Sequence, residues 1–307
     1  MFAEIIDRKN TPYAELVNPI LSAALRSVDP YDCVYHNIAL NGDQLTIGGK
    51  VYSLDEYDHI YLIGTGKAVQ PMAGAVLDRL SGKISGGILI GKHNDAVYSK
   101  NLPAEIIFTL GSHPVPGPSS INSTMQLTTF LKKVTRKDLV ICLISGGGSA
   151  LMTLPYEPLT LTDIQSTTKA LLFSGATINE VNIVRKHLDQ VKGGGLARMT
   201  APATLITLVL SDVIGDALDA IASGPTVADC SIYRDAISII KKYELEKRLP
   251  KAVMEHLEKG VKGLIPETVK EREECLARTS TLIVGSLAQA ARAAQRKALE
   301  AGFQARI

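Results

Sequence analysis

Residues 58–68 read DHIYLIGTGKA, an apolar run that ends at a glycine-rich turn. The run predicts a strand over 58–64, and the spacing of apolar residues after it predicts a helix from Lys67 to Leu80. Because the run is apolar throughout instead of alternating, the strand should be covered by helices on both faces. The stretch therefore predicts one strand, turn and helix unit of an α/β fold.

The same order of strand, turn and helix recurs along the chain. Further apolar runs predict strands over 87–91, 105–111, 138–144 and 203–210. Helical spacing predicts helices over 13–26, 119–134, 162–173 and 178–191. The predicted fold class is α/β, with a doubly wound, mostly parallel, Rossmann-like sheet.

The pattern changes near residue 235. Charged helices are predicted around 233–245 and 250–259, and a strand at Thr281 to Gly285 with an alanine-rich helix to Ala301 follows them. The last residues, 302–307, resemble the opening of another strand. We expect residues 1–235 to form the Rossmann-like domain, and residues 236–307 to form linker helices and the truncated start of a smaller α/β domain.

Composition excludes several classes of protein. Lys and Arg (33) nearly balance Asp and Glu (31) and are scattered, so neither a nucleic-acid nor a membrane partner is expected. The four cysteines form no CxxC pair, which argues against a zinc site or a disulfide framework. The N-terminus lacks the apolar stretch of a signal peptide, and we expect a cytoplasmic protein.

The turn at residues 64–68 is the first candidate for a ligand-binding loop. Glycines such as Gly64 and Gly66 let a backbone approach an anion, while Lys67 places a cation where it opposes the helix dipole. A ligand phosphate would explain that cation. The alternative is a tight turn with a solvated lysine, because the spacing gives neither a Walker A loop nor a complete GxGxxG.

A second glycine loop follows the strand predicted over 138–144. Gly146, Gly147 and Gly148 precede Ser149, and three consecutive glycines favour a backbone nest for phosphate or substrate over a structural turn. A serine-hydrolase elbow is the rival interpretation. It is weaker because the last glycine of GxSxG is replaced by Leu151.

Charged residues follow in two further segments. Arg185 and Lys192 lie near the end of a predicted helix, where basic residues and glycines are also ordinary helix termination signals. Asp212 and Asp216 follow a predicted strand, where carboxylates can hold Mg²⁺, orient a hydroxyl or cap a helix. The turn at 222–226 could approach a phosphate, and His113 fits a structural loop better than a ligand contact.

Seven motifs in order carry a resemblance to a known family. They are GTGKA at 64–68, GSHPVP at 111–116, SGGGSAL at 145–151, NIVRKHL at 182–188, KGG at 192–194, SDVIGD at 211–216 and SGPT at 223–226. With these motifs the chain resembles the MOFRL-type, class II glycerate kinases from about Leu21 onward. Members of that family run on for about another hundred residues, so residues 1–307 resemble its larger part.

The resemblance implies an enzyme and its site. It implies transfer of phosphate from Mg²⁺-bound ATP to D-glycerate, the 2-phosphate being favoured, in a cleft between two domains. Lys67, Arg185 and Asp212 would be catalytic, and Asp212 and Asp216 would hold Mg²⁺. The residues that would bind ATP are Gly64, Gly66, Gly146, Gly147, Gly148, Ser149 and Lys192. A homodimer is a further expectation.

Two alternatives remain open. One is a hydroxypyruvate reductase, a label attached to relatives of this family. Against it, a dinucleotide-binding site requires a complete GxGxxG, which the turn at residues 64–68 lacks. The other is a nucleotide-binding module without catalytic activity, since the family's second domain is missing from residues 1–307.

Overall fold

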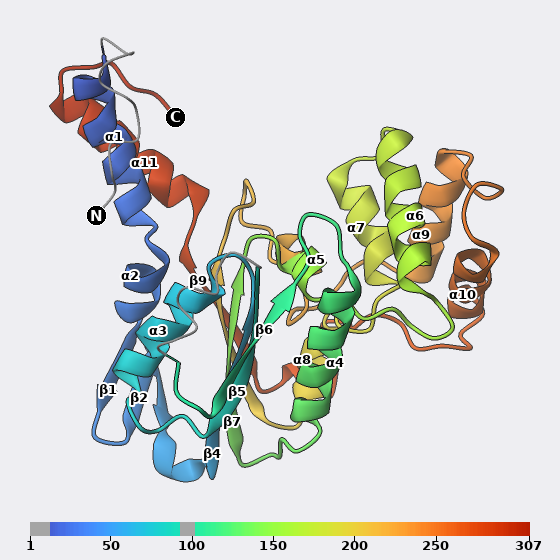
Figure 1. The fold of residues 1–307 in the computed structure, drawn as a ribbon, viewed down its shortest axis with the longest axis horizontal. Helices are drawn as coiled ribbons and strands as arrows, with labels where there is room; N and C mark the ends of the chain where they lie inside the picture. Colours follow the sequence, from blue (N-terminus) through green and yellow to red (C-terminus); the bar gives the residue numbers. More distant parts are fainter. Residues whose placement is uncertain (1–12, 93–101) are drawn as a thin grey trace.

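A six-stranded parallel sheet forms the centre of the computed structural model, which describes residues 13–92 and 102–307 (Figure 1). The strands are β4 (His59–Thr65), β5 (Gly86–Lys92), β6 (Ile106–Gly111), β7 (Asp138–Ser145), β8 (Thr204–Leu210) and β9 (Thr279–Gly285). Their order across the sheet is β6-β5-β4-β7-β8-β9, so the direction of winding reverses between β4 and β7. This is the strand order of a Rossmann fold, and the predicted fold class is confirmed.

Helices cover both faces of the sheet. The neighbouring residues Leu62 and Ile63 of β4 are both fully buried and belong to two different apolar cores. One core contains α2 (Pro30–Tyr35) and α3 (Val69–Arg79), and the other contains α4 (Pro118–Leu131) and α8 (Gly195–Thr200). Burial on both faces explains why these strands are apolar throughout rather than alternating.

A small antiparallel sheet was not anticipated from the sequence. Its strands are β1 (Ile38–Asn41), β2 (Gln44–Ile47) and β3 (Lys50–Ser53). Two-residue turns join them, and Gly48 and Gly49 in the second turn have φ of 56° and 82°. Two adjacent residues at positive φ are the requirement of a tight hairpin, so this glycine pair was the available signal.

Four helices form a separate cluster beside the sheet, drawn to one side in Figure 1. They are α6 (Leu161–Phe173), α7 (Ile178–Lys186), α9 (Tyr233–Lys242) and α10 (Lys251–Val261), and they share an apolar core of their own. Each helix was predicted, with bounds that differ by a few residues. Capping boxes at Thr160 and Thr177 begin α6 and α7.

The C-terminal residues lie against the first half of the chain. Strand β9 was expected to open a second domain, but it pairs in parallel with β8 at the edge of the six-stranded sheet. Helix α11 (Leu287–Glu300) packs beside α1 (Ala14–Ser27), and residues 302–307 form no strand. An apolar run in the sequence predicts a strand but does not show which strand it pairs with. The domain boundary at residue 235 stays a prediction.

None of the helices within residues 13–92 and 102–307 has the length and apolar composition that crossing a bilayer would require.

Candidate functional site

The loops that follow β4 and β7 meet at the carboxyl edge of the sheet. The backbone N–H of Lys67 donates to the carbonyl oxygen of Gly146 at 2.9 Å, and the N–H of Ala68 donates to Ser145 Oγ at 3.0 Å. Winding reverses between these two strands, and that reversal is where open α/β sheets bind ligands. The two predicted glycine loops therefore form one structure.

Gly64 and Gly66 are explained by the packing of these loops. A β-carbon at position 66 would lie 2.1 Å from Ser145 Oγ, and one at position 64 would lie 2.7 Å from the carbonyl oxygen of Leu143. Any side chain there would push the loops apart. Both glycines thus shape the site through the backbone.

The glycine run at 146–148 is surrounded by chemically active side chains. A β-carbon at Gly146 would lie 1.9 Å from a carboxylate oxygen of Asp212. One at Gly147, where φ is 87°, would lie 3.0 Å from the His113 ring and 3.2 Å from Cγ of Lys67. Three side chains that are far apart in sequence thus converge on the backbone of this run.

The two charged members of this group have free charges. Lys67 and Asp212 are both exposed, and within the described part of the chain neither the ammonium nor the carboxylate makes a hydrogen bond or ion pair. Beside a glycine run, an exposed cation is suited to binding a phosphate, and an exposed carboxylate is suited to binding a divalent cation.

The charged side chains around His113 affect its pKa. Partial burial lowers the pKa of His113 below its ordinary value, and the cations Lys67 and Lys92 lower it further, while Asp212 acts in the opposite direction. Lys92, which ends β5, was missed by the sequence analysis. Its position directly after the predicted strand at 87–91 was the signal for it.

Removing the Lys67 charge should raise the pKa of His113, because one of the cations that disfavour the imidazolium would be gone. An NMR titration of the His113 ring in Lys67→Ala would measure this shift. Lys132→Ala, an exposed lysine just after the far end of α4, is the control and should leave the titration unchanged. A His113 titration identical in both variants would contradict the geometry.

Arg185 lies on α7 and reaches the second glycine loop. Its Nη2 donates to the carbonyl oxygen of Ser149 at 3.1 Å, while its Nε is buried and has no hydrogen-bond partner among the residues that the structure describes. Burial lowers the pKa of the guanidinium, and Asp189 opposes that shift without forming an ion pair with it. Arg185 thus retains an unused donor close to the glycine run.

The turn at 222–226 also reaches this loop. Ser149 and Ser223 share a hydrogen bond of 2.7 Å between their hydroxyls, and Ser223 donates to Asn182 Oδ1 at 3.4 Å. Ala222 and Ser223 have φ of 51° and 62°. Left-handed backbone costs about 1–2 kcal/mol for each such residue, and strain of this kind clusters at ligand sites.

Lys192 does not join the exposed group. Its ammonium is buried and donates to Asp189 Oδ2 at 2.7 Å, the carbonyl oxygen of Met152 at 3.0 Å and Thr153 Oγ1 at 3.4 Å. Burial lowers the pKa of Lys192 to about 8, and Asp189 acts against that shift. These contacts hold the residues just after α5 (Gly148–Leu151), so Lys192 supports the glycine run from within.

The two carboxylates predicted to hold Mg²⁺ lie in one loop after β8. Asp216 has φ of 56°, and its Oδ1 is buried with no hydrogen-bond partner in the described part of the chain. In residues 13–92 and 102–307, no group of three His, Cys, Asp or Glu side chains is arranged to hold a metal. The free Asp212 carboxylate and the unpaired Asp216 oxygen suit an ion that takes its other ligands from phosphate and water.

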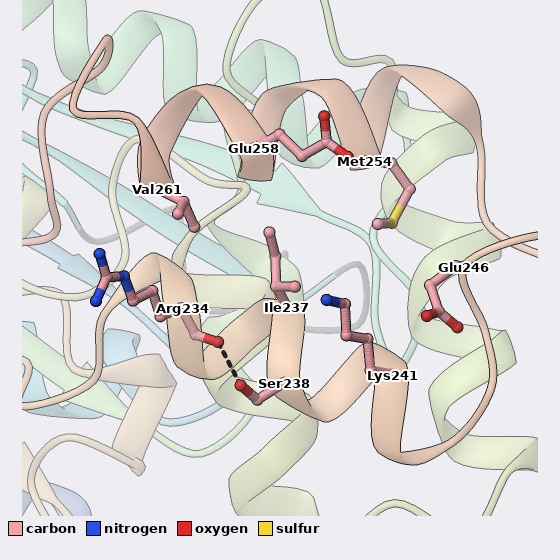
Figure 2. A pocket seen from close by; sticks show the side chains of 8 residues that line it. All are labelled: Arg234, Ile237, Ser238, Lys241, Glu246, Met254, Glu258 and Val261. Carbon is pink, nitrogen blue, oxygen red and sulfur yellow. Dashed lines mark hydrogen bonds between the residues drawn. The ribbon is translucent and has the colours of Figure 1, made fainter.

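Two hollows differ in their relation to this group. One of about 840 Å³ lies between residues 114–116 and the helices α6 and α7, and Arg185 lines it. Figure 2 shows another, of about 580 Å³, between α9 and α10, whose lining includes Arg234, Lys241 and Glu258. The second hollow contains none of the predicted site residues, whereas the first adjoins them.

Comparison with known proteins supports the relation that the motifs suggested. A family model described as "Domain of unknown function (DUF4147)" matches residues 16–258. A glycerate 2-kinase from Pyrococcus horikoshii is 38% identical over 288 residues, which cover 94% of this chain and 63% of the relative. The solved structure of a glycerate kinase from Thermotoga maritima is similar with a TM-score of 0.77 at 33% identity, covering 95% of this chain and 63% of that one.

A relative from Agrobacterium vitis carries a different name, provisionally that of a hydroxypyruvate reductase. It is 39% identical over 247 residues, which are 80% of this chain and 52% of the relative. The chain thus spans between half and two thirds of the length of these relatives. The chain belongs to the DUF4147 family and is related to the class II glycerate kinases.

Proposed function

We propose that this chain forms the larger part of an ATP-dependent kinase that converts D-glycerate to phosphoglycerate, the 2-phosphate being favoured. The observation that carries the proposal is the convergence of Lys67, His113 and Asp212 on the glycine run that follows β7, at the point where the winding of the sheet reverses. Relatives named glycerate kinases over almost the whole chain support the same reaction.

In this proposal the backbone N–H groups from Gly146 to Ser149 bind phosphate oxygens. Lys67, whose side chain lies beside Gly147, stabilises the charge on the phosphoryl group as it moves. Arg185 adds a second cationic contact through its unpaired Nε. Phosphoryl transfer depends mainly on such positioning and electrostatic stabilisation, which are what these residues offer.

The bonds change as follows. The acceptor hydroxyl oxygen of D-glycerate bonds to the γ-phosphorus of ATP, and the bond from that phosphorus to the β–γ bridging oxygen breaks. The bridging oxygen keeps the electron pair on ADP. The hydroxyl proton passes to the Asp212 carboxylate and then to solvent. Asp212 and Asp216 would hold Mg²⁺, which supplies charge neutralisation on the phosphates when bound.

Further expectations attach to the whole protein. We place it in the cytoplasm, with a division at residue 235, a second domain of MOFRL type closing the cleft, and a homodimer as its assembly. Neither a nucleic acid nor a membrane is proposed as a partner, because the 33 basic residues are scattered among 31 acidic ones.

Asp212→Asn should lower kcat at least about tenfold, because the amide neither accepts the proton nor holds Mg²⁺ as a carboxylate does. The melting temperature should stay unchanged, since the carboxylate is exposed and makes no hydrogen bond within the described residues. Steady-state assays of ADP formation measure the first effect and thermal unfolding the second. An unaltered kcat would remove Asp212 from the mechanism.

The name of the Agrobacterium vitis relative motivates a second candidate, a hydroxypyruvate reductase. The loop at Gly64 and Gly66 lacks the third glycine of a dinucleotide site, since position 69 is Val. Two assays on protein expressed from the complete reading frame decide between them. ADP formation that requires D-glycerate supports the kinase, and NADH oxidation that requires hydroxypyruvate without ATP supports the reductase.

A further inference from the structure

The hollow beside Arg185 has the size and lining of a small-molecule groove. Its volume is about 840 Å³, within the range of about 300–1,000 Å³ that is usual for ligand pockets. One wall is the loop at 114–116, and the other is formed by α6 and α7. Gln165 Nε2 donates to the carbonyl oxygen of Pro116 at 2.7 Å and links the two walls.

The groove exposes apolar side chains that a folded protein normally covers. Leu172, Phe173 and Ile178 are 56%, 78% and 63% exposed, and Val115 on the facing wall is 57% exposed. Contiguous exposed apolar side chains mark binding surfaces more often than ordinary solvent-facing ones. The lining therefore suits a flat apolar group, with Thr168 and Gln165 available for polar contacts.

The groove is continuous with the glycine run. Arg185 lines the groove and donates to the carbonyl oxygen of Ser149, so one side chain borders both. The loop at 114–116 begins directly after His113, whose ring lies against Gly147. A ligand in the groove can therefore extend an anionic tail past Arg185 to Lys67.

We propose that this groove binds the nucleoside of the nucleoside triphosphate, with the base between residues 114–116 and Leu172–Phe173. This deepens the function proposed above and rests on it. The Nε of Arg185 then donates to the α- or β-phosphate. That phosphate supplies the counter-charge for a buried guanidinium that forms no ion pair within residues 13–92 and 102–307. D-glycerate, with three carbons, is too small to fill the groove and takes the other side of the glycine run.

The test compares two ligands on two matched variants. Leu172→Gln with Phe173→Gln makes the groove polar without adding charge. Leu299→Gln with Phe303→Gln is the control: these residues are 53% and 42% exposed, and Leu299 is the second-last residue of α11 as Leu172 is of α6. Calorimetry with ATP and with inorganic tripolyphosphate, both with Mg²⁺, measures the contribution of the nucleoside separately from that of the phosphates.

The groove variant should bind ATP at least about tenfold more weakly and change tripolyphosphate affinity by less than about twofold. The control should bind both ligands as the unaltered chain does. Unchanged ATP affinity in the groove variant, or an equal loss for both ligands, would overturn the groove assignment and leave the kinase proposal standing. An unaltered chain that bound neither ligand would overturn the two together.

Discussion

Replacing Lys67 by alanine is expected to lower glycerate-dependent ADP formation at least about 100-fold while the protein stays folded. Lys67 is an exposed cation beside Gly147, and no residue in the described part of the chain neutralises its ammonium. Its removal takes away charge stabilisation that the transition state needs most. The assay compares kcat in Lys67→Ala with kcat in Lys132→Ala, the exposed lysine used as a control above.

The same variant should not lose stability. Lys67 lies two residues before α3 begins at Val69, where a cation opposes the helix dipole, so its loss removes an unfavourable interaction. Thermal unfolding should therefore give a melting temperature equal to or slightly above that of the unaltered protein. Near-normal turnover in Lys67→Ala would remove this lysine from the reaction. A lower melting temperature would assign it a structural role.

Replacing Asp189 by alanine should lower the free energy of unfolding by about 3–5 kcal/mol. The carboxylate is buried and accepts from Lys192 Nζ at 2.7 Å, from the backbone N–H groups of Val191 and Leu154 at 3.1 and 3.2 Å, and from Thr153 Oγ1. Without it, the Lys192 ammonium would be an uncompensated buried charge. Chemical denaturation followed by circular dichroism measures the loss.

Two comparisons make the Asp189 result specific. Asp43 forms an exposed ion pair with Lys83 at 2.9 Å, and Asp43→Ala should cost less than about 1 kcal/mol. Combining Asp189→Asn with Lys192→Met should recover part of the loss, because the buried charge is removed together with its partner. Equal losses in Asp189→Ala and Asp43→Ala would contradict the buried pair that Lys192 is inferred to form.

The central sheet was predictable because its strands are buried on both faces. Each strand predicted from a continuous apolar run became one of β4 to β9, since such runs have few other uses in a chain of this kind, whereas the strand opening expected at residues 302–307 did not form. The small sheet was missed because its four-residue strands carry little periodicity. The neighbour of β9 could not be predicted either, because strand pairing is set by contacts far apart in sequence.

The site was predictable where it follows strand ends. Lys67 and Gly146 follow β4 and β7, and Asp212 follows β8, so the parallel sheet alone brings them to one edge. Lys192 shows where such reasoning stops. A lysine before a glycine run gave no sign that its ammonium would turn inward to Asp189, because that contact depends on the packing of the helical segment after β7.

The most direct test of the kinase proposal is ³¹P NMR of the reaction of ATP, Mg²⁺ and D-glycerate with protein expressed from the complete reading frame. We predict that ADP and phosphoglycerate accumulate in equal amounts, with the new phosphate on the 2-hydroxyl. ATP left unchanged, or ADP that forms with inorganic phosphate and no phosphoglycerate, would contradict the kinase proposal.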